Sequence, residues 1–179
     1  LNNDTLPEPG WLPPLLEVLR DVPDAGAVGA KLVYPDGRLQ EAGGVVFADG
    51  SAANIGRDDP EPDDPLYNHR REVDYCSAAT LATPRALFLE VGGFDPRYAP
   101  AYYEDTDYAF ALREHGYRVY YQPASVVVHL EGGTAGTDPG EGVKRFQRVN
   151  REKFVARWGP ALAHQLARPQ VVLLAGEHQ

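Results

Sequence analysis

Residues 103–129 read YEDTDYAFALREHGYRVYYQPASVVVH, a helical pattern followed directly by an extended one. Apolar positions recur at helical spacing between Tyr108 and Leu112, acidic residues precede them, and Gly116 supplies a stop signal behind them. Acidic residues at the start of a helix are favourable because the helix dipole is positive there. These features predict a helix over 105–115.

The segment behind this helix carries two extended runs, 118–122 and 125–129, which are rich in β-branched and aromatic residues. Pro123 separates the two runs, because proline cannot donate a hydrogen bond to a sheet. A glycine-rich loop follows at 131–142. We therefore predict that His129 ends a strand at the mouth of a loop.

The rest of the chain alternates between helical and extended patterns. Helical patterns cover residues 11–20, 85–91 and 143–158, the last of them ended by Gly159 and Pro160. Extended patterns cover residues 27–34, 39–47 and 72–83, and a turn at Asp36 and Gly37 joins the first two into a hairpin. Residues 56–67 are mostly Asp, Glu and Pro, so we expect a mobile surface loop with little to bury.

The composition is that of a folded globular protein with an acidic surface. The chain has 179 residues, which favours one domain, and 43% of them are hydrophobic. There are 26 acidic and 17 basic residues, giving a net charge of −9. This charge repels phosphate backbones and anionic lipid headgroups, and so disfavours binding to nucleic acids or to membrane surfaces.

Cys76 is the only cysteine, so the chain cannot form an internal disulfide or a zinc site with several cysteines. This favours a reducing, intracellular location. The small size of the Cys76 side chain suits a buried position. No apolar run approaches the roughly 20 residues of a membrane helix. The chain contains no methionine and opens on Leu1 in what reads as the end of a strand. We therefore expect it to be the interior or C-terminal part of a longer protein.

Three short motifs carry groups suited to chemistry. Asp4, two residues after Asn2 on a strand-to-helix connection, is an oxygen ligand suited to Mg²⁺ or Mn²⁺ on a diphosphate, or it simply caps a turn. Glu104 and Asp105 lie at a helix start, where the dipole keeps a general base ionised, or they are ordinary helix-terminal charges. His129 is either a core histidine or the nitrogen partner of Asp4 at a Mn²⁺ site.

Taken in order, these motifs resemble family 2 glycosyltransferases of the GT-A fold, in particular the bacterial rhamnosyltransferase-like group. The resemblance covers roughly residues 1–134 and rests on Leu1 to Thr5, Gly92 to Asp95, Tyr103 to Asp107, Gly116 to Val119 and Pro123 to His129.

The resemblance implies an α/β fold, the C-terminal half of a GT-A domain, with a mixed sheet and flanking helices. It implies that residues 1–179 form a single partial domain without the N-terminal nucleotide-binding half. Asn2 and Asp4 stand where the family has its DxD motif, and the metal, Mn²⁺ or Mg²⁺, falls to Asp4 and His129. The catalytic base falls to Asp105, with Glu104 next to it.

The activity implied is inverting transfer of a sugar from a nucleotide-diphosphate sugar to the hydroxyl of a glycan or lipid-linked acceptor, in polysaccharide or cell-surface glycan synthesis. The upstream part of the same polypeptide would hold the nucleotide, so we expect the isolated chain to be inactive. The location implied is cytoplasmic, at the inner face of a membrane through other parts of the protein. Two alternatives stay open: a non-catalytic fragment or sugar-binding module of the same fold, and a metal-dependent hydrolase.

Overall fold

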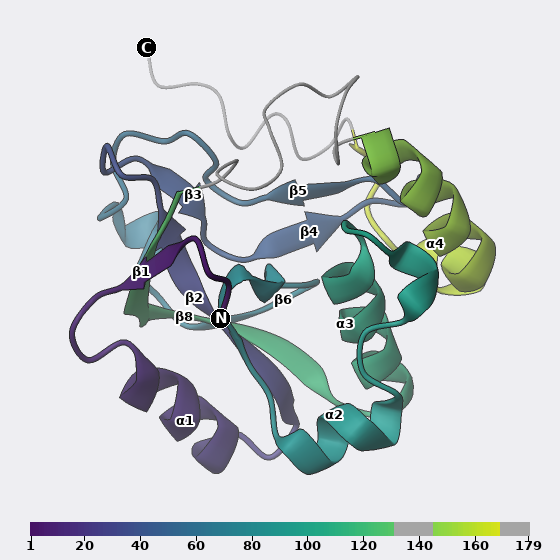
Figure 1. Cartoon of the computed structure of the whole chain (residues 1–179), viewed down its shortest axis with the longest axis horizontal. Helices are drawn as coiled ribbons and strands as arrows, with labels where there is room; N and C mark the ends of the chain where they lie inside the picture. Colours follow the sequence, from purple (N-terminus) through teal and green to yellow (C-terminus); the bar gives the residue numbers. More distant parts are fainter. Residues whose placement is uncertain (131–144, 169–179) are drawn as a thin grey trace.

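Two long parallel strands form the centre of the computed structural model, which describes residues 1–130 and 145–168 (Figure 1). The two strands are β2 (Ala25–Val33) and β8 (Arg118–His129). Antiparallel neighbours complete a six-stranded mixed sheet: β1 (Thr5–Pro7) and β6 (Arg71–Val73) on β8, and β3 (Leu39–Glu41) and β7 (Leu81–Ala82) on β2. A separate two-stranded sheet is formed by β4 (Gly44–Val46) and β5 (Ala52–Asn54).

Helices flank the sheet at its sides (Figure 1). They are α1 (Leu12–Asp21), α2 (Arg85–Val91), α3 (Glu104–Glu114) and α4 (Phe146–Leu162). Short 3₁₀ turns are η1 (Pro65–Tyr67), η2 (Ala78–Thr80) and η3 (Pro96–Tyr98). None of the helices in the described ranges combines the length and the apolar character that a membrane crossing requires.

The two faces of the sheet belong to different hydrophobic clusters. Successive residues of a strand point to opposite faces, and the fully buried neighbours Ala27 and Val28 of β2 follow this rule. Val28 packs in the cluster of Leu15 from α1, whereas Ala27 packs in the larger cluster with Tyr108 of α3 and Trp158 of α4. The sheet is therefore covered on both faces, as expected of an α/β fold.

Most of the predicted elements are present. The helices expected at 11–20, 85–91 and 105–115 correspond to α1, α2 and α3, within a residue at each end. The hairpin is confirmed in its first part, since β3 pairs antiparallel with β2. Its second part is corrected, because residues 44–46 leave that sheet and pair with β5 instead. The glycine-rich loop at 131–142 lies outside the described residues.

Two boundaries that the sequence placed at proline are wrong. Pro123 does not divide two strands, because β8 runs through it and the pairing register with β2 skips from Gln122 to Val126, so that the proline lies in a bulge. Pro160 does not end the last helix either, and α4 continues to Leu162. Leu162 is only 1% exposed, and burying it offsets the backbone hydrogen bond that the proline removes.

The acidic loop at 56–67 is more closely attached to the fold than its composition indicates. Backbone hydrogen bonds join it to β3, from the Leu39 amide to the Asp59 carbonyl (2.8 Å) and from the Asp58 amide to the Leu39 carbonyl (2.9 Å). Tyr67 is buried, and its hydroxyl donates to a carboxylate oxygen of Asp59 at 2.7 Å. The expectation that this loop has little to bury is wrong at Tyr67, while its mobility stays a prediction.

Gly29, in the middle of β2, offers a direct test of the packing between the sheet and the segment that follows β6. A Cβ at this position would lie 2.3 Å from the Cβ of Cys76 and 2.5 Å from its sulfur. We expect Gly29→Ala to lower the free energy of unfolding by about 1–3 kcal/mol, because two buried backbones would have to separate. Urea denaturation measures the change, and Gly159→Ala, which meets nothing within 4 Å, is the control.

Candidate active site

The pairing of β1 with β8 brings two predicted site residues together. Thr5 is registered opposite His129, and the Leu130 amide donates to the Asp4 carbonyl at 2.9 Å. As a result, the Asp4 carboxylate oxygen Oδ1 lies 3.4 Å from the imidazole Nε2 of His129. Both side chains are largely buried, with 17% and 14% of their surfaces exposed. The structure thus joins residues at opposite ends of the sequence into one oxygen and nitrogen pair.

A third residue contacts the other nitrogen of the imidazole. Nδ1 of His129 lies 2.7 Å from the side-chain oxygen Oε1 of Gln40, which can only accept, so Nδ1 is the donor of this hydrogen bond. The amide nitrogen of Gln40 donates to the His129 carbonyl at 3.4 Å, which orients the amide in this sense. Nε2 therefore faces the Asp4 carboxylate, and in its neutral form the imidazole could ligate a cation together with that carboxylate.

This donor set fits Mn²⁺ or Mg²⁺ held jointly by protein and substrate. One carboxylate and one imidazole suit Mn²⁺, and substrate oxygens complete the coordination when a diphosphate is bound. In the described part of the chain, no three His, Cys, Asp or Glu residues gather around one metal position. Asn2 is exposed and is held through its backbone, whose amide donates to the Ala79 carbonyl at 2.9 Å. Asp4 and His129 are therefore the candidate pair whose side chains lie close enough to share one cation.

The predicted base lies at the first turn of α3, after an unusual loop. Tyr102 and Tyr103, directly before the helix, both adopt left-handed backbone conformations with φ of 72° and 73°. Residues other than glycine rarely adopt this backbone conformation, and backbone strain of this kind is found most often at functional sites. Asn150 of α4 fixes the loop, since its side-chain nitrogen donates to the Tyr98 carbonyl at 2.7 Å and to the Ala101 carbonyl at 2.9 Å. The start of α3, where Glu104 and Asp105 lie, is therefore fixed by contacts of the preceding loop with α4.

Two tyrosines near the start of α3, Tyr98 and Tyr103, serve in packing. Tyr98 is fully buried and its hydroxyl donates to Asp107 at 2.8 Å. The ring of Tyr103 packs on Phe154 at a centroid distance of 5.3 Å, and its hydroxyl donates to the Gly50 carbonyl at 2.9 Å. Their contacts tie the loop to the core.

The Asp105 carboxylate is held by three hydrogen bonds. Its Oδ2 accepts from the Ala78 amide at 3.2 Å, and its Oδ1 accepts from the amide and the hydroxyl of Thr106 at 2.7 and 3.2 Å. The residue as a whole is only partly buried. Even so, burial of the carboxylate raises the pKa of Asp105 above its usual range, outweighing the lowering effect of the hydrogen bonds.

Its neighbour Glu104 shows the same effect. Burial, and after it the charge of Asp105, raises the pKa of Glu104 to about 7. Its buried oxygen Oε2 has no hydrogen-bond partner within the described structure. The expectation that the helix dipole dominates at these carboxylates is therefore corrected: desolvation moves their pKa upwards. A carboxylate with a raised pKa is a stronger proton acceptor.

The turn η2 connects the candidate base with the segment that carries the candidate metal ligand. The Ala78 amide binds Asp105, and the Ala79 carbonyl accepts from the Asn2 amide, two residues before Asp4. This places both chemical groups within one hydrogen-bonded unit. That Asp105, Asp4 and His129 open into one cleft stays a prediction.

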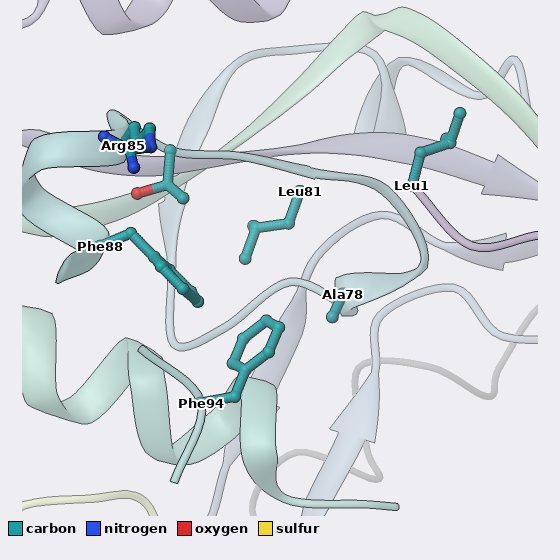
Figure 2. A pocket seen from close by; sticks show the side chains of 7 residues that line it. Leu1, Ala78, Leu81, Arg85, Phe88 and Phe94 are labelled. Carbon is teal, nitrogen blue, oxygen red and sulfur yellow. The ribbon is translucent and has the colours of Figure 1, made fainter. Parts of the chain in front are cut away.

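An open groove of about 310 Å³ borders this turn (Figure 2). Its lining is mainly apolar and consists of Leu1, Ala78, Leu81, Thr83, Arg85, Phe88 and Phe94. The rings of Phe88 and Phe94 meet edge to face at a centroid distance of 5.3 Å. Because Ala78 lines the groove and also binds Asp105, the groove lies beside the candidate base.

The chain was compared with known proteins. The sequence profile described as glycosyltransferase like family 2 matches residues 1–152, most of the chain. The chain belongs to glycosyltransferase family 2. Within this family it is 30% identical over 148 residues to an N-acetylglucosaminyl-diphospho-decaprenol L-rhamnosyltransferase of Mycobacterium tuberculosis, an alignment that covers 77% of this chain and 48% of that enzyme.

Other similarities agree with this membership in glycosyltransferase family 2. The O-antigen biosynthesis protein RfbC of Myxococcus xanthus is 32% identical over 144 residues, covering 77% of this chain and 11% of that protein. A crystal structure of GalNAc-T7 with UDP, GalNAc and Mn²⁺ superposes with a TM-score of 0.63 at 16% identity, covering 97% of this chain and 35% of that one. The α/β fold is thus that of a GT-A glycosyltransferase. The chain spans less than half the length of these relatives.

Two residues of the site were missed by sequence reasoning. Gln40 orients His129, and the Ser77 amide donates to the carboxylate of Glu41 at 2.8 Å. Both lie in β3 and are almost fully buried. A Gln-Glu pair in the middle of an otherwise apolar extended stretch was the available signal, because buried polar side chains require partners.

Proposed function

We propose that this chain contributes the cation ligands and the catalytic base of an inverting glycosyltransferase. The donor would be a nucleotide-diphosphate sugar and the acceptor a hydroxyl group of a glycan. The observation that carries the proposal is the approach of His129 Nε2 to the Asp4 carboxylate at 3.4 Å, with Nδ1 of the same ring against Gln40. A carboxylate oxygen and an imidazole nitrogen at this separation can both ligate one divalent cation.

In this proposal each residue has a defined task. Asp4 and His129 would hold Mn²⁺ or Mg²⁺, which neutralises the charge of the leaving diphosphate when it is bound. Asp105 accepts the proton of the acceptor hydroxyl as its oxygen forms a bond to the anomeric carbon and the bond from that carbon to the diphosphate oxygen breaks. Attack from the face opposite the diphosphate inverts the anomeric configuration.

The acceptor is proposed from the surroundings of the base. Two of the relatives carry names that indicate an acceptor or a product. By these names, one acts in O-antigen biosynthesis and the other acts on a sugar linked to decaprenol through a diphosphate. Beside Asp105, the groove offers apolar walls, and Arg85 at its edge has no ion pair in the structure described. These features suit an acceptor linked to a lipid through phosphate, and hence polysaccharide or cell-surface glycan synthesis at the cytoplasmic face of a membrane.

The cation site is tested on the 179-residue chain itself. We expect Asp4→Ala to weaken Mn²⁺ binding by roughly tenfold or more, because the substitution removes the only charged ligand of the pair. Titration followed by electron paramagnetic resonance measures free Mn²⁺ directly. Asp21→Ala, which removes an exposed carboxylate paired with Arg20, is the control and should bind as the parent does. Equal binding by the parent and Asp4→Ala would remove the basis of the proposed site.

The reaction is tested by product analysis on the longest natural polypeptide that includes this chain. Incubation with a panel of nucleotide sugars and hydroxyl acceptors should give an elongated acceptor. Free sugar as the only product would favour the metal-dependent hydrolase. Sugar binding without either product would favour a non-catalytic sugar-binding module.

A further inference from the structure

Strand β3 contains two adjacent polar residues that are almost fully buried. Gln40 is 2% exposed and Glu41 is 1% exposed. Burying an amide and a carboxyl group costs free energy unless each is hydrogen-bonded. Since successive side chains of a strand point to opposite faces, the two reach different partners, and each partner is part of the candidate active site.

Gln40 contacts His129 at two points. Its side-chain oxygen accepts from Nδ1 of the imidazole at 2.7 Å, and its side-chain nitrogen donates to the backbone carbonyl of the same residue at 3.4 Å. The first contact makes Nδ1 a donor, and the second orients the amide of Gln40. Together they direct Nε2 of His129 towards Asp4.

Glu41 contacts the turn that binds the base. Its Oε1 accepts from the Ser77 amide at 2.8 Å, and the next amide along the chain, that of Ala78, donates to Asp105 at 3.2 Å. The Ser77 hydroxyl in turn accepts from the Ala79 amide at 3.2 Å, which closes the turn. Two consecutive backbone amides of this turn, those of Ser77 and Ala78, therefore donate to Glu41 and to the candidate base Asp105.

We propose that Gln40 and Glu41 are positioning residues that hold the candidate metal ligand His129 and the candidate base Asp105 in register from a single strand. The inference rests on the proposed function. A cation and a base that act on one sugar must keep a fixed separation, and small displacements are costly to rate. Gln40 and Glu41 are consecutive residues of one strand. The sheet therefore holds their two partners at a fixed separation.

The charge state of Glu41 supports this role. Burial raises the pKa of Glu41 to about 8, so the side chain is neutral at neutral pH. The groups that act on it electrostatically are the carboxylate of Asp105, which raises the pKa further, and the guanidinium of Arg57, which lowers it. The phenols of Tyr75 and Tyr121 and the thiol of Cys76 also interact with it and are neutral there. A neutral Glu41 holds the turn without placing a second charge beside the base.

The role of Gln40 is tested by Mn²⁺ binding to the 179-residue chain. We expect Gln40→Ala to weaken binding by about tenfold, the lower end of what loss of an outer-shell partner causes. His129→Ala calibrates the assay, and Gln147→Ala, on the exposed surface of α4, is the matched control. If Gln40→Ala binds like the parent while His129→Ala is impaired, the inference is overturned. If His129→Ala binds like the parent, the proposed cation site itself fails.

The role of Glu41 is tested by comparing Glu41→Ala with Glu41→Gln, which keeps an acceptor oxygen for the Ser77 amide. We expect Glu41→Ala to lower kcat for sugar transfer by about tenfold with an unchanged KM for the donor, and Glu41→Gln to restore most of that rate. In the isolated chain, the amide resonance of Ala78 should shift in Glu41→Ala and stay close to the parental position in Glu41→Gln. Equal kcat for Glu41→Ala and the parent, or equal loss in both variants, would overturn the role.

Discussion

Replacing Asp105 by Asn should lower the rate of sugar transfer by roughly 10²-fold or more, because the amide cannot accept the proton of the acceptor hydroxyl. The loss should fall on kcat, and the affinities for Mn²⁺ and donor should stay close to the parental values, since Asp105 touches neither in the proposed arrangement. Steady-state kinetics of the longest natural polypeptide that includes this chain measure the effect, with Mn²⁺ binding followed in parallel.

The substitution needs a control for structure. Asp105 accepts hydrogen bonds at both oxygens, from Ala78 at one and from Thr106 at the other, and an asparagine can replace only one of these oxygens as an acceptor. Thermal unfolding of Asp105→Asn therefore accompanies the kinetics, and Glu104→Gln is measured beside it. Transfer at the parental rate by Asp105→Asn, with a slow Glu104→Gln variant, would assign the base to Glu104 instead.

The second large effect concerns the pH dependence of stability at Glu41. Its pKa of about 8 in the folded chain lies well above the value of 4.5 for an unperturbed glutamate. The unfolded chain therefore releases this proton at lower pH than the folded chain does. The stability that the protonated side chain provides is complete below about pH 4.5 and is lost as the pH rises to about 8. The shift corresponds to a free energy on the order of 5 kcal/mol.

Glu41→Gln should remove this pH dependence. We expect the free energy of unfolding of the variant, relative to the parent, to rise by several kcal/mol between about pH 4.5 and about pH 8. Urea denaturation of the 179-residue chain across this range measures it, and Glu17→Gln, at an exposed position of α1, should leave the difference constant. A difference that does not vary with pH would show that Glu41 is ionised in the folded state.

Individual helices and strands could be predicted from the sequence because the patterns that indicate them lie within a few neighbouring residues. The spacing of Tyr108 and Leu112 and the stop at Gly116 located α3, since helical periodicity and capping depend on residues within one or two turns. The same holds for the position of His129 at the end of β8. The order of the short motifs was enough to indicate the family, which the profile over residues 1–152 confirms.

The pairing of Asp4 with His129 was a hypothesis at the level of sequence, and the structure places the two side chains 3.4 Å apart. Their roles as ligands, and that of Asp105 as base, stay proposals. The prediction that the helix dipole governs the charge of Asp105 was wrong, because the dipole is worth at most about 1–2 kcal/mol whereas desolvation of a buried carboxylate can exceed that. Burial is a property of the assembled fold, and the sequence of a helix start does not contain it.

By itself, the sequence determined most of the helices, the central strands and the family, and it supplied the candidates for binding a cation and accepting a proton. Only the tertiary structure decided what holds those residues in place. Gln40 is 89 positions from His129, and Glu41 is 36 positions from Ser77, so no periodicity or motif spacing relates them. The contact of Gln40 with His129 exists because β3 and β8 lie on either side of β2 in one sheet, and buried polar side chains are stabilised by the partners that the fold brings near them.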